Sequence, residues 1–282
     1  MPWATNQRMS IRFDLRVDAP IRAYAIARPD QPLHFEQVPG AVRVVDPLDP
    51  ANRDYCLAMN RANCIAYDGS PTPGAASTAL GMPLWVFLDC CVLPSAVVGF
   101  EMPSSAMPPD LRRAFDPTGT QDWLPFTEYI ALPSTTPGEV VGVSLFSFAE
   151  AGRWGRRTKA LGLLLHAATQ QVGVAQYTNP SVRLHLSLGP LRLLSRRTEV
   201  HSRPAETFVY RSQVASPDEL REVLEHGRVI TGPGLPVHHS FDPRDPAARA
   251  QFVDMDRDRA ALIVGAGDVV DNELTRIDIT FE

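Results

Sequence analysis

The chain has 282 residues, of which 44% are hydrophobic and 21% charged, and its formal net charge at pH 7 is −5. This size and composition suit a globular protein with one large domain, or one domain with an appended segment. The acidic balance argues against a nucleic acid as partner, and no apolar run approaches the roughly 20 residues of a membrane helix, so we expect no membrane partner either.

The N-terminus and the cysteines favour a cytoplasmic location. The N-terminal stretch MPWATNQRMSIRFDLR is polar and lacks the apolar core of a signal peptide. The four cysteines are Cys56, Cys64, Cys90 and Cys91, and the last two are adjacent, so they cannot easily bridge each other. We therefore expect no disulfide scaffold, and a reducing cytoplasm is the simplest interpretation.

The 26 prolines divide the chain into short elements. They gather in four stretches that we expect to be loops: 68–77, 101–111, 131–139 and 232–246. In the first half, periodicity and β-rich composition predict two strands, one helix and two antiparallel hairpins. These are, in order, strands 22–29 and 41–48, helix 50–69, hairpin 83–103, and a hairpin of 126–133 with 139–148.

The second half alternates helices and strands. We expect a helix from about Thr158 to Val172, ended by Gly173 as its C-terminal cap. The further expected elements are strand 174–179, helix 180–189, strands 190–200 and 205–213, helix 216–227, a second helix after the proline loop, and strands 260–265 and 276–281.

A cationic turn joins the strand-like run 140–148 to the helix that follows. Arg153, Arg156, Arg157 and Lys159 crowd this turn. A helix N-terminus offers free backbone N–H groups and the positive end of the helix dipole, so it attracts anions before any side chain is counted. We expect a pyrophosphate-sized anion at residues 153–160, although a solvated charged face is the alternative.

Three partial motifs give the chain its family resemblance. Arg157-Thr-Lys-Ala160-Leu-Gly162 has the form R-x-x-A-x-G, and NPSVRLHLSLG (179–189) is close to a pattern of Asn, Leu, Tyr and Gly that follows one helix and strand later. LDCCVLPSAVVGFEMP (88–103) is similar to a hairpin upstream of both. On these motifs the sequence resembles the GNAT family of acyl-CoA-dependent N-acyltransferases over roughly residues 42–212. It departs from the family in having no R-G-x-G-x-G run, and in carrying His185 where the family often has Tyr.

The resemblance implies an α+β fold with a central mixed, mostly antiparallel sheet flanked by helices. It divides the chain into an N-terminal arm (1–40), a GNAT-like core (41–213) and a C-terminal extension (214–282). A proline-rich insertion (103–136) interrupts the core. The extension could close over the acceptor, donate a strand or form a homodimer contact.

The activity implied by the resemblance is transfer of an acyl group, expected to be acetyl, from a coenzyme A thioester to the amine of a small molecule by direct attack. No metal cofactor is expected. The last strand residues before the turn would pair with the pantetheine arm, and one of their N–H groups would polarise the thioester carbonyl. The implied donor-binding residues are Leu145, Phe146, Ser147, Phe148, Arg153, Gly155, Arg156, Arg157, Thr158, Lys159, Ala160 and Asn179.

The resemblance also suggests catalytic groups. His185 would protonate the departing thiolate in place of the family's Tyr, and Glu150 or Glu128 would accept the proton of the amine. A core histidine, surface carboxylates and a water-mediated base are the alternatives, and Asn179 could instead cap a helix.

Other functions stay open at this stage. The same fold could be a non-catalytic module that binds acyl-CoA or a protein partner, or could carry out other acyl-thioester chemistry, such as transfer from an acyl carrier protein, O-acylation or decarboxylation. A nucleophilic cysteine (Cys90 or Cys91) is less favoured, because both would lie within an apolar strand. His238 and His239, on a proline-rich loop, lack the spacing of a metal site.

Overall fold

The computed structural model describes residues 13–14, 19–68, 81–93, 96–149, 152–198, 206–230 and 234–282. The strands in these ranges are β1 (Arg22–Ile26), β2 (Val42–Val45), β3 (Ala96–Pro103), β4 (Trp123–Pro125), β5 (Thr127–Pro133), β6 (Glu139–Ser147), β7 (Gln170–Gln176), β8 (Leu191–Ser195), β9 (Thr207–Gln213), β10 (His239–Phe241), β11 (Ala261–Ala266), β12 (Val269–Val270), β13 (Glu273–Leu274) and β14 (Ile277–Phe281). The α-helices are α1 (Arg53–Asp68), α2 (Leu84–Val92), α3 (Pro109–Phe115), α4 (Trp154–Leu165), α5 (Ser181–Leu186), α6 (Pro217–His226) and α7 (Pro246–Asp254). Three short 3-10 helices are η1 (Phe35–Gln37), η2 (Pro50–Asn52) and η3 (Ser104–Ala106).

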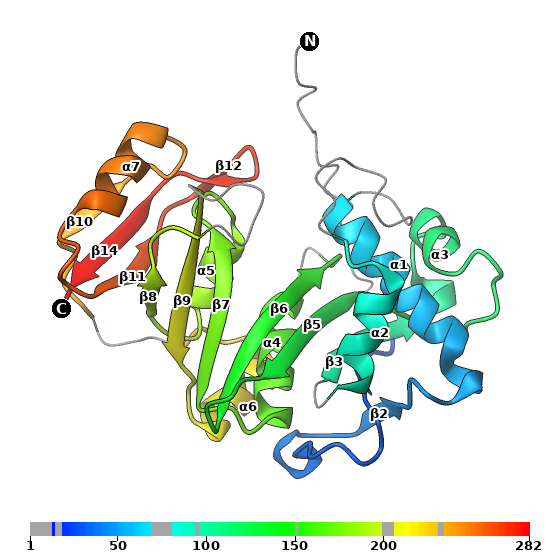
Figure 1. Cartoon of the computed structure of the whole chain (residues 1–282). Coiled ribbons are helices and arrows are strands. Elements are labelled where there is room, and N and C mark those ends of the chain that lie inside the picture. Colours follow the sequence, from blue (N-terminus) through cyan, green and yellow to red (C-terminus); the bar gives the residue numbers. More distant parts are fainter. Residues whose placement is uncertain are drawn as a thin grey trace.

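A twelve-stranded open sheet runs through the described part of the chain. Its order is β10-β14-β11-β8-β9-β7-β6-β5-β3-β1-β2, with β4 paired to β3. The pairs β1–β2 and β6–β7 are parallel, and the other pairs of this sheet are antiparallel. Figure 1 shows this sheet extending from the red C-terminal strands to the blue β2. The expectation of a mixed, mostly antiparallel sheet with helices is confirmed at this level.

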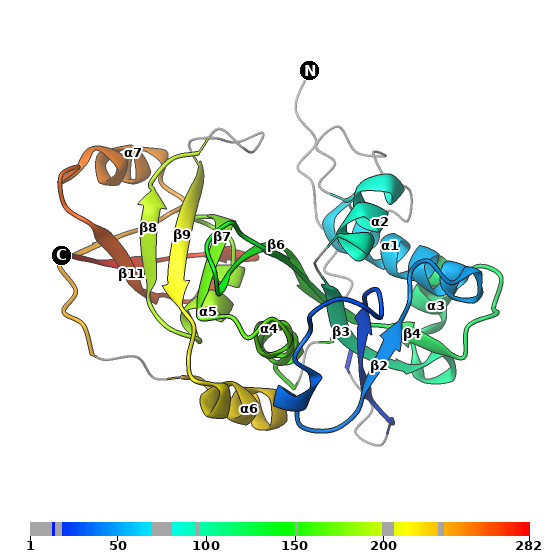
Figure 2. The ribbon, with the colours of Figure 1, turned by 60° about the horizontal axis from the view of Figure 1, so that its bottom comes forward.

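Helices cover the central strands on both faces. Tyr129 of β5 lies against Gly162 of α4, whereas its neighbour Glu128 is bonded to Asn63 of α1. Because successive strand residues point to opposite faces, α4 and α1 lie on opposite sides of β5. Figure 2 shows α4 nearly end-on with α6 beyond it, and α1 and α2 on the other side of the strands.

The sheet does not follow the boundaries of the expected arm, insertion and extension. From the expected arm, β1 lies inside the sheet between β2 and β3, and from the expected insertion, β5 lies between β3 and β6. From the expected extension, β10, β11 and β14 add strands beyond β8, while α6 packs on α4. The C-terminal segment therefore continues the main sheet.

The predicted hairpin at 83–103 is wrong in its first half. Residues Leu84–Val92 form α2, and only Ala96–Pro103 form a strand. Phe87, Cys90 and Cys91 are buried at helical spacing, but a nine-residue apolar run has the same appearance in a helix and in a fully buried strand. The two cysteines are thus helical, not mid-strand.

The helix after the cationic turn begins earlier and ends earlier than predicted. It starts at Trp154 rather than Thr158, directly after Arg153 at φ 57°, and it stops at Leu165. Gly173 is in the middle of β7 and caps no helix. A Cβ at Gly173 would lie 2.5 Å from the hydroxyl oxygen of Tyr210 on β9, so this glycine lets the Tyr210 ring cross the strand.

Gly162 provides a comparable close approach between α4 and the sheet. A Cβ at this position would lie 2.4 Å from Cδ1 and 2.8 Å from Cε1 of Tyr129, which is itself buried. The family resemblance assigned Gly162 to a phosphate-binding motif, but the structure places it in the packing between helix and sheet. The missing side chain sets the distance between α4 and β5.

We predict that Gly162→Ala destabilises the protein despite the better helix propensity of alanine, by about 1–3 kcal/mol of unfolding free energy. The added methyl group must displace the Tyr129 ring inside a packed core. Urea unfolding followed by circular dichroism measures the change. Gly234→Ala is the matched control, because a Cβ there meets nothing within 4 Å. Equal midpoints for the two variants would contradict this account of the helix–sheet contact.

Candidate functional site

The site begins where β6 and β7 stop pairing. Their parallel ladder runs from Glu139 opposite Gln170 to Gly142 opposite Gly173. Directly after it, β6 has a bulge against β5, because Ile130 lies opposite Ser144 and Ala131 opposite Gly142, which leaves Val143 as the extra residue. A bulge bends its strand and increases the local twist. Beyond the bulge, β6 remains paired with β5, and β7 remains paired with β9.

Three elements converge beside the end of β6. A Cβ at Gly155, in the first turn of α4, would lie 2.8 Å from Cδ1 of Leu184 on α5 and 3.9 Å from Cβ of Ser147 on β6. His185 follows Leu184 on the same short helix. Of the residues expected at the site, Ser147 and Gly155 therefore come together, and α5 places Leu184 beside them and His185 beside Lys159 of α4.

Two of the predicted phosphate-binding arginines bind protein instead. Nη1 of Arg153 and Nη1 of Arg156 donate to the carbonyl oxygen of Gly227, at 3.1 and 2.7 Å, and Nε of Arg156 donates to Oγ of Ser187 at 2.7 Å. Gly227 is the C-terminal cap of α6. The carboxyl end of a helix carries partial negative charge, which explains why it attracts these guanidinium groups.

Arg157 lies beside them with a different role. Its guanidinium carbon is 4.7 Å from the centre of the Trp154 ring, a cation–π geometry. Burial and the neighbouring Arg153 lower the pKa of Arg157. Among the described residues, no bond joins its side chain to another polar side chain. Its charge is therefore the one in the turn that is least committed to other parts of the protein.

The next three predicted donor-binding residues lie inside the protein. Thr158, Lys159 and Ala160 are fully buried; Thr158 contacts the sheet and Lys159 contacts His185 on α5. The hydroxyl of Thr158 donates to the carbonyl of Trp154 and lies 2.8 Å from that of Thr127 on β5. Only the first turn of this helix has backbone amides without an intrahelical acceptor, so an anion at α4 would have to bind there.

The other predicted contacts are distributed as follows. Oδ1 of Asn179 accepts a bond of 2.8 Å from the amide of Ser181, so Asn179 stabilises the start of α5. Phe146 and Phe148 meet edge to face, with ring centres 5.1 Å apart. Glu150 lies outside the described residues.

Lys159 is paired with His185. Nζ of Lys159 lies 3.0 Å from Nδ1 of His185, Lys159 is fully buried, and His185 is 8% exposed. Burial lowers the pKa of Lys159 to about 7. Burial, and secondarily the charge of Lys159, lowers the pKa of His185 well below its ordinary value. The predicted proton donor is thus a neutral imidazole next to a lysine that titrates near neutrality.

Glu128 lies on the opposite face of the sheet in a polar cluster under α1. Its Oε1 accepts bonds from Oγ of Ser144 at 2.5 Å and from Nδ2 of Asn63 at 2.7 Å, while its Oε2 is buried without a partner in the described structure. Burial raises the pKa of this carboxyl to about 7, although the two hydrogen bonds oppose the shift. Glu128 therefore has the proton affinity of a base that works near neutral pH.

Tyr67 links this carboxyl to the strand edge. The hydroxyl oxygens of Tyr67 and Ser144 are 3.1 Å apart, and the Leu145 N–H donates to the Tyr67 hydroxyl at 2.9 Å. The same hydroxyl lies 3.2 Å from the Leu145 carbonyl oxygen. A chain of short contacts therefore runs from Glu128 to the Leu145 amide, one of the groups expected to polarise a substrate carbonyl.

Sequence reasoning missed Asn63, Tyr67 and Ser144. Asn63 and Tyr67 are one turn apart on α1 and face the same side. Two polar residues at this spacing on the buried face of a helix were the available signal. No sequence pattern marked Ser144, because its role depends on the bulge beside it.

The cysteines and histidines considered as alternative catalytic or metal-binding groups lack the features of such groups. Burial raises the pKa of Cys90 to about 11 and lowers that of His166 to about 4. Nδ1 of His238 lies 3.0 Å from the amide nitrogen of Phe281, and the ring of His239 stacks on Phe241. Within the described ranges, no three His, Cys, Asp or Glu side chains are grouped as metal ligands would be.

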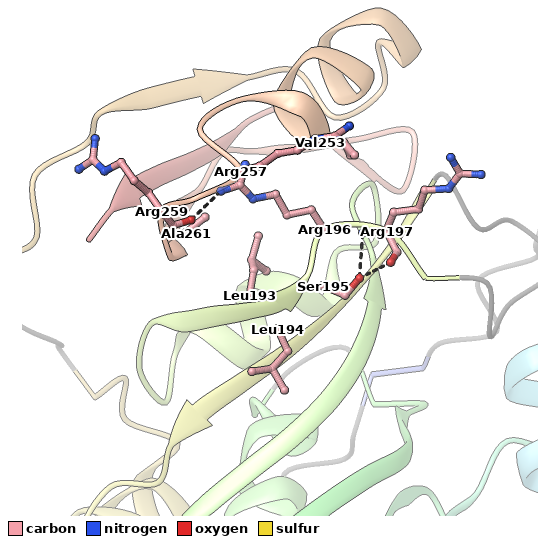
Figure 3. A pocket seen from close by; sticks show the side chains of 9 residues that line it. All are labelled: Leu193, Leu194, Ser195, Arg196, Arg197, Val253, Arg257, Arg259 and Ala261. Atoms are coloured by element: carbon pink, nitrogen blue, oxygen red, sulfur yellow. Dashed lines mark hydrogen bonds between the residues drawn. The ribbon is translucent and has the colours of Figure 1, made fainter.

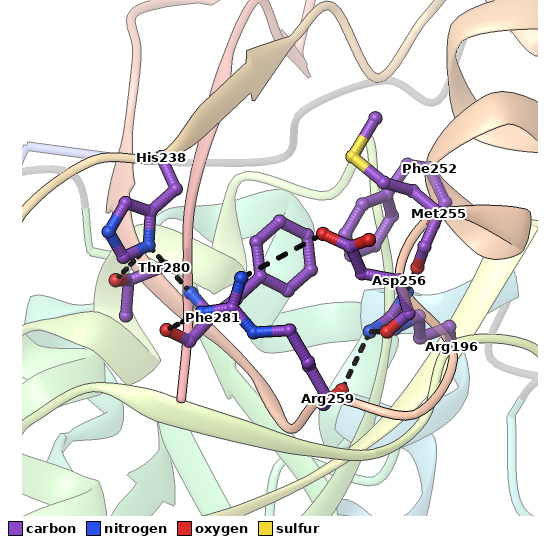
Figure 4. Close-up of polar contacts among 8 residues, drawn as sticks. All are labelled: Arg196, His238, Phe252, Met255, Asp256, Arg259, Thr280 and Phe281. Carbon is purple, nitrogen blue, oxygen red and sulfur yellow. Dashed lines mark hydrogen bonds and ion pairs between the residues drawn. The ribbon is translucent and has the colours of Figure 1, made fainter.

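A separate hollow of about 300 Å³ lies between β8, β11 and the end of α7, and four arginines are among its lining residues (Figure 3). Arg196, which crosses it, is committed to structure. Its two terminal nitrogens donate to the backbone carbonyls of Phe252, Met255, Asp256 and Arg259. Its guanidinium also lies over the rings of Phe252 and Phe281, at 5.2 and 5.4 Å (Figure 4). Arg196 thus closes the carboxyl end of α7.

No family model, curated protein or solved structure matches this chain. Among the helices in the described part of the chain, none combines the length and apolar composition needed to cross a bilayer.

We predict a specific pH dependence of stability from Glu128. Because its pKa is raised from 4.5 to about 7, the native state binds an extra proton between these values. The contribution of Glu128 to the unfolding free energy is then fully present below pH 4.5 and declines as the pH rises to about 7, by on the order of 3 kcal/mol. Glu128→Gln should lack this decline.

Urea unfolding at several pH values measures the difference between wild type and Glu128→Gln. Ser144→Ala is the second variant: it removes a bond that favours the ionised carboxylate, so it should move the decline to higher pH. A Glu128→Gln variant with the same pH profile as wild type would show that this carboxyl is not held protonated by burial.

Proposed function

We propose that this protein is an acyl-CoA-dependent N-acyltransferase with a GNAT-like core and a small amine as acceptor. The observation that carries the proposal is the divergence of the parallel strands β6 and β7 after Gly142 and Gly173, next to the first turn of α4. An extended ligand with amide groups can pair with a strand edge opened in this way. The pantetheine arm of coenzyme A has this character.

The order of elements supports the same proposal. The resemblance expects a strand that enters a phosphate-binding turn, then a helix, a strand and a second helix. β6, α4, β7 and α5 follow each other in this order, and β6 and β7 are neighbours in the sheet. The donor phosphates would lie at the first-turn amides of α4, with Arg157 as the closest uncommitted cation.

The chemistry would use groups on both sides of the opening. Glu128 would take the proton of the attacking amine through the hydroxyls of Ser144 and Tyr67, and its pKa of about 7 suits this task. The Leu145 N–H, bonded to Tyr67 in this structure, would donate to the developing oxyanion. His185 would return a proton to the departing thiolate.

The acceptor is proposed to be a small molecule. The net charge of −5 gives no basic surface excess for a nucleic-acid or ribosomal acceptor. A primary amine that reaches the Tyr67 hydroxyl would come within the hydroxyl chain that leads to Glu128.

One observation favours a second candidate, a GNAT-fold module that binds without catalysis. Arg153 and Arg156 are both bonded to the end of α6, so two cations of the turn are withdrawn from a phosphate ligand. Such a module would bind acyl-CoA or a protein partner through the same opening and release no thiol.

We predict that millimolar coenzyme A and acetyl-CoA raise the melting temperature, because a ligand of the native state alone stabilises it by mass action. In a panel of small amines, acetyl-CoA should then release free thiol, and Glu128→Gln should lower turnover about 100-fold without a similar loss of donor affinity. Stabilisation without thiol release would favour the binding module. No stabilisation by either compound would contradict both the coenzyme A-dependent acyltransferase and a module that binds acyl-CoA.

We also predict that two adjacent arginines behave differently. Arg157→Ala should weaken coenzyme A binding about tenfold in calorimetry, because it removes the uncommitted charge at the first turn. Arg156→Ala should instead lower the unfolding free energy by about 1–3 kcal/mol, because it breaks the bonds to Gly227 and Ser187. An unchanged affinity of Arg157→Ala for coenzyme A would contradict the placement of the donor phosphates at this turn.

A further inference from the structure

Lys159 is the one lysine in the sequence, and the other 26 of the 27 Lys and Arg residues are arginines. It is also fully buried. Arginine stays protonated at any physiological pH, whereas lysine loses its proton readily when it is desolvated. The chain thus has a single side-chain amine, and it lies in the interior beside the imidazole expected to act in the reaction.

The surroundings of this amine contain few charges. His185 on α5 is its hydrogen-bond partner, at 3.0 Å. The ring of Tyr210 on β9 lies beside His185, with ring centres 5.2 Å apart, and Tyr129 on β5 faces α4. Arg156, one turn earlier on α4, is directed to Ser187 and Gly227. Among the described residues, no ion pair joins Lys159 or His185 to a carboxylate, and burial is the main cause that lowers both pKa values.

A buried ammonium without a counter-ion is unfavourable, so an ordinary structural role does not explain a lysine here. Methionine or leucine would fill the same volume without that cost. What lysine adds is a proton that can leave. Lys159 is fully buried, and its hydrogen-bond partner His185 is 8% exposed, so the imidazole offers that proton a route out of the interior.

We propose that Lys159 and His185 form a proton relay, in which the Lys159 ammonium is the acid and the His185 imidazole passes its proton to the leaving thiolate. The relay rests on the acyltransferase function proposed above. It adds a positioning and proton-donating residue that the family resemblance had assigned to phosphate binding.

The step balances as follows. An ammonium can only donate, so Nδ1 of His185 accepts from Nζ and the ring carries its proton on Nε2. As the C–S bond of the donor breaks, the thiolate takes the Nε2 proton while Nζ gives a proton to Nδ1. The products are a thiol, a neutral amine and a neutral imidazole in the other tautomer. A solvent proton at Nε2, with return of the Nδ1 proton to Nζ, restores the starting state.

The relay explains how this histidine can be an acid at all. Its pKa is lowered well below the ordinary value, so an isolated imidazolium would not form near neutral pH. The lysine supplies the missing proton, and its pKa of about 7 matches a donor that works at neutral pH. The depression of both pKa values by burial thus becomes useful when the two groups act together.

Nuclear magnetic resonance tests the pair independently of any activity. Labelling with ¹³C,¹⁵N-lysine gives one side-chain signal, because the chain has one lysine. We expect that signal to titrate near pH 7, and ¹⁵N-histidine spectra to show His185 neutral with its proton on Nε2 below that pH. A lysine that titrates near 10, or an Nδ1–H tautomer below pH 7, would overturn the relay.

Kinetic measurements test the role of the relay in turnover. In wild type, turnover limited by thiolate departure should fall above about pH 7 as Lys159 loses its proton. Lys159→Met should reduce turnover about 100-fold and abolish this descending limb, with coenzyme A affinity retained. Lys159→Arg, which keeps the charge but cannot release the proton, should be as slow as Lys159→Met, and His185→Phe combined with Lys159→Met should be no slower than either alone.

The outcomes separate the relay from the proposed function. Thiol release with an unchanged pH profile in Lys159→Met would overturn the relay and leave the acyltransferase standing. A pair that titrates as expected in spectra, with no thiol release from wild type on any donor, would overturn the acyltransferase and with it the thiolate as proton acceptor. A Lys159→Met variant that fails to fold leaves the wild-type titration and Lys159→Arg as the deciding measurements.

Discussion

The parallel pairing of β6 with β7, and its interruption after Gly142, is the constraint on which the rest of the structure depends. A strand in the middle of a sheet normally has both edges satisfied. Here the bulge at Val143 turns β6 away from β7 and leaves an opening inside a twelve-stranded sheet. The groups of the proposed reaction lie beside this opening: Leu145 on its edge, Lys159 and His185 of α4 and α5 on one face, and Glu128 with Tyr67 of α1 on the other.

The two faces present complementary proton chemistry. On the α1 face, burial holds a carboxyl in its protonated range up to about pH 7, and on the α4 face burial brings an amine down to the same value. Neither group has an ion-pair partner among the described residues. Such groups are costly to bury, and functional sites are where proteins commonly carry that cost.

Local sequence patterns predicted the elements well where one pattern dominates. The hairpin of β5 and β6, the helix α1 with its amphipathic spacing, and the capped helix α6 are all confirmed. The run Leu84–Val92 was predicted as a strand but forms a helix, because a mostly apolar run has no periodicity that distinguishes the two. The start of α4 was misplaced by four residues, because Trp154 to Arg157 read as a charged turn although they form the first turn of a helix.

The site was less accessible to sequence reasoning than the fold. Glu128 and His185 were identified as chemical candidates, yet the groups that define their behaviour come from far along the chain: Asn63 is 65 residues from Glu128, and Lys159 is 26 residues from His185. The arginines were expected to need an anionic partner from outside. For Arg153 and Arg156 that partner is the end of α6, which only tertiary packing could bring there.

The bond between Tyr67 and Leu145 also protects a strand edge. A strand edge open in mid-sheet is a template on which another chain could add a strand and begin to aggregate. The Tyr67 hydroxyl meets both backbone groups of Leu145, and the amide of Phe13 donates to the carbonyl of Phe148 a few residues on. These contacts occupy backbone groups of the edge and thereby oppose self-association through it.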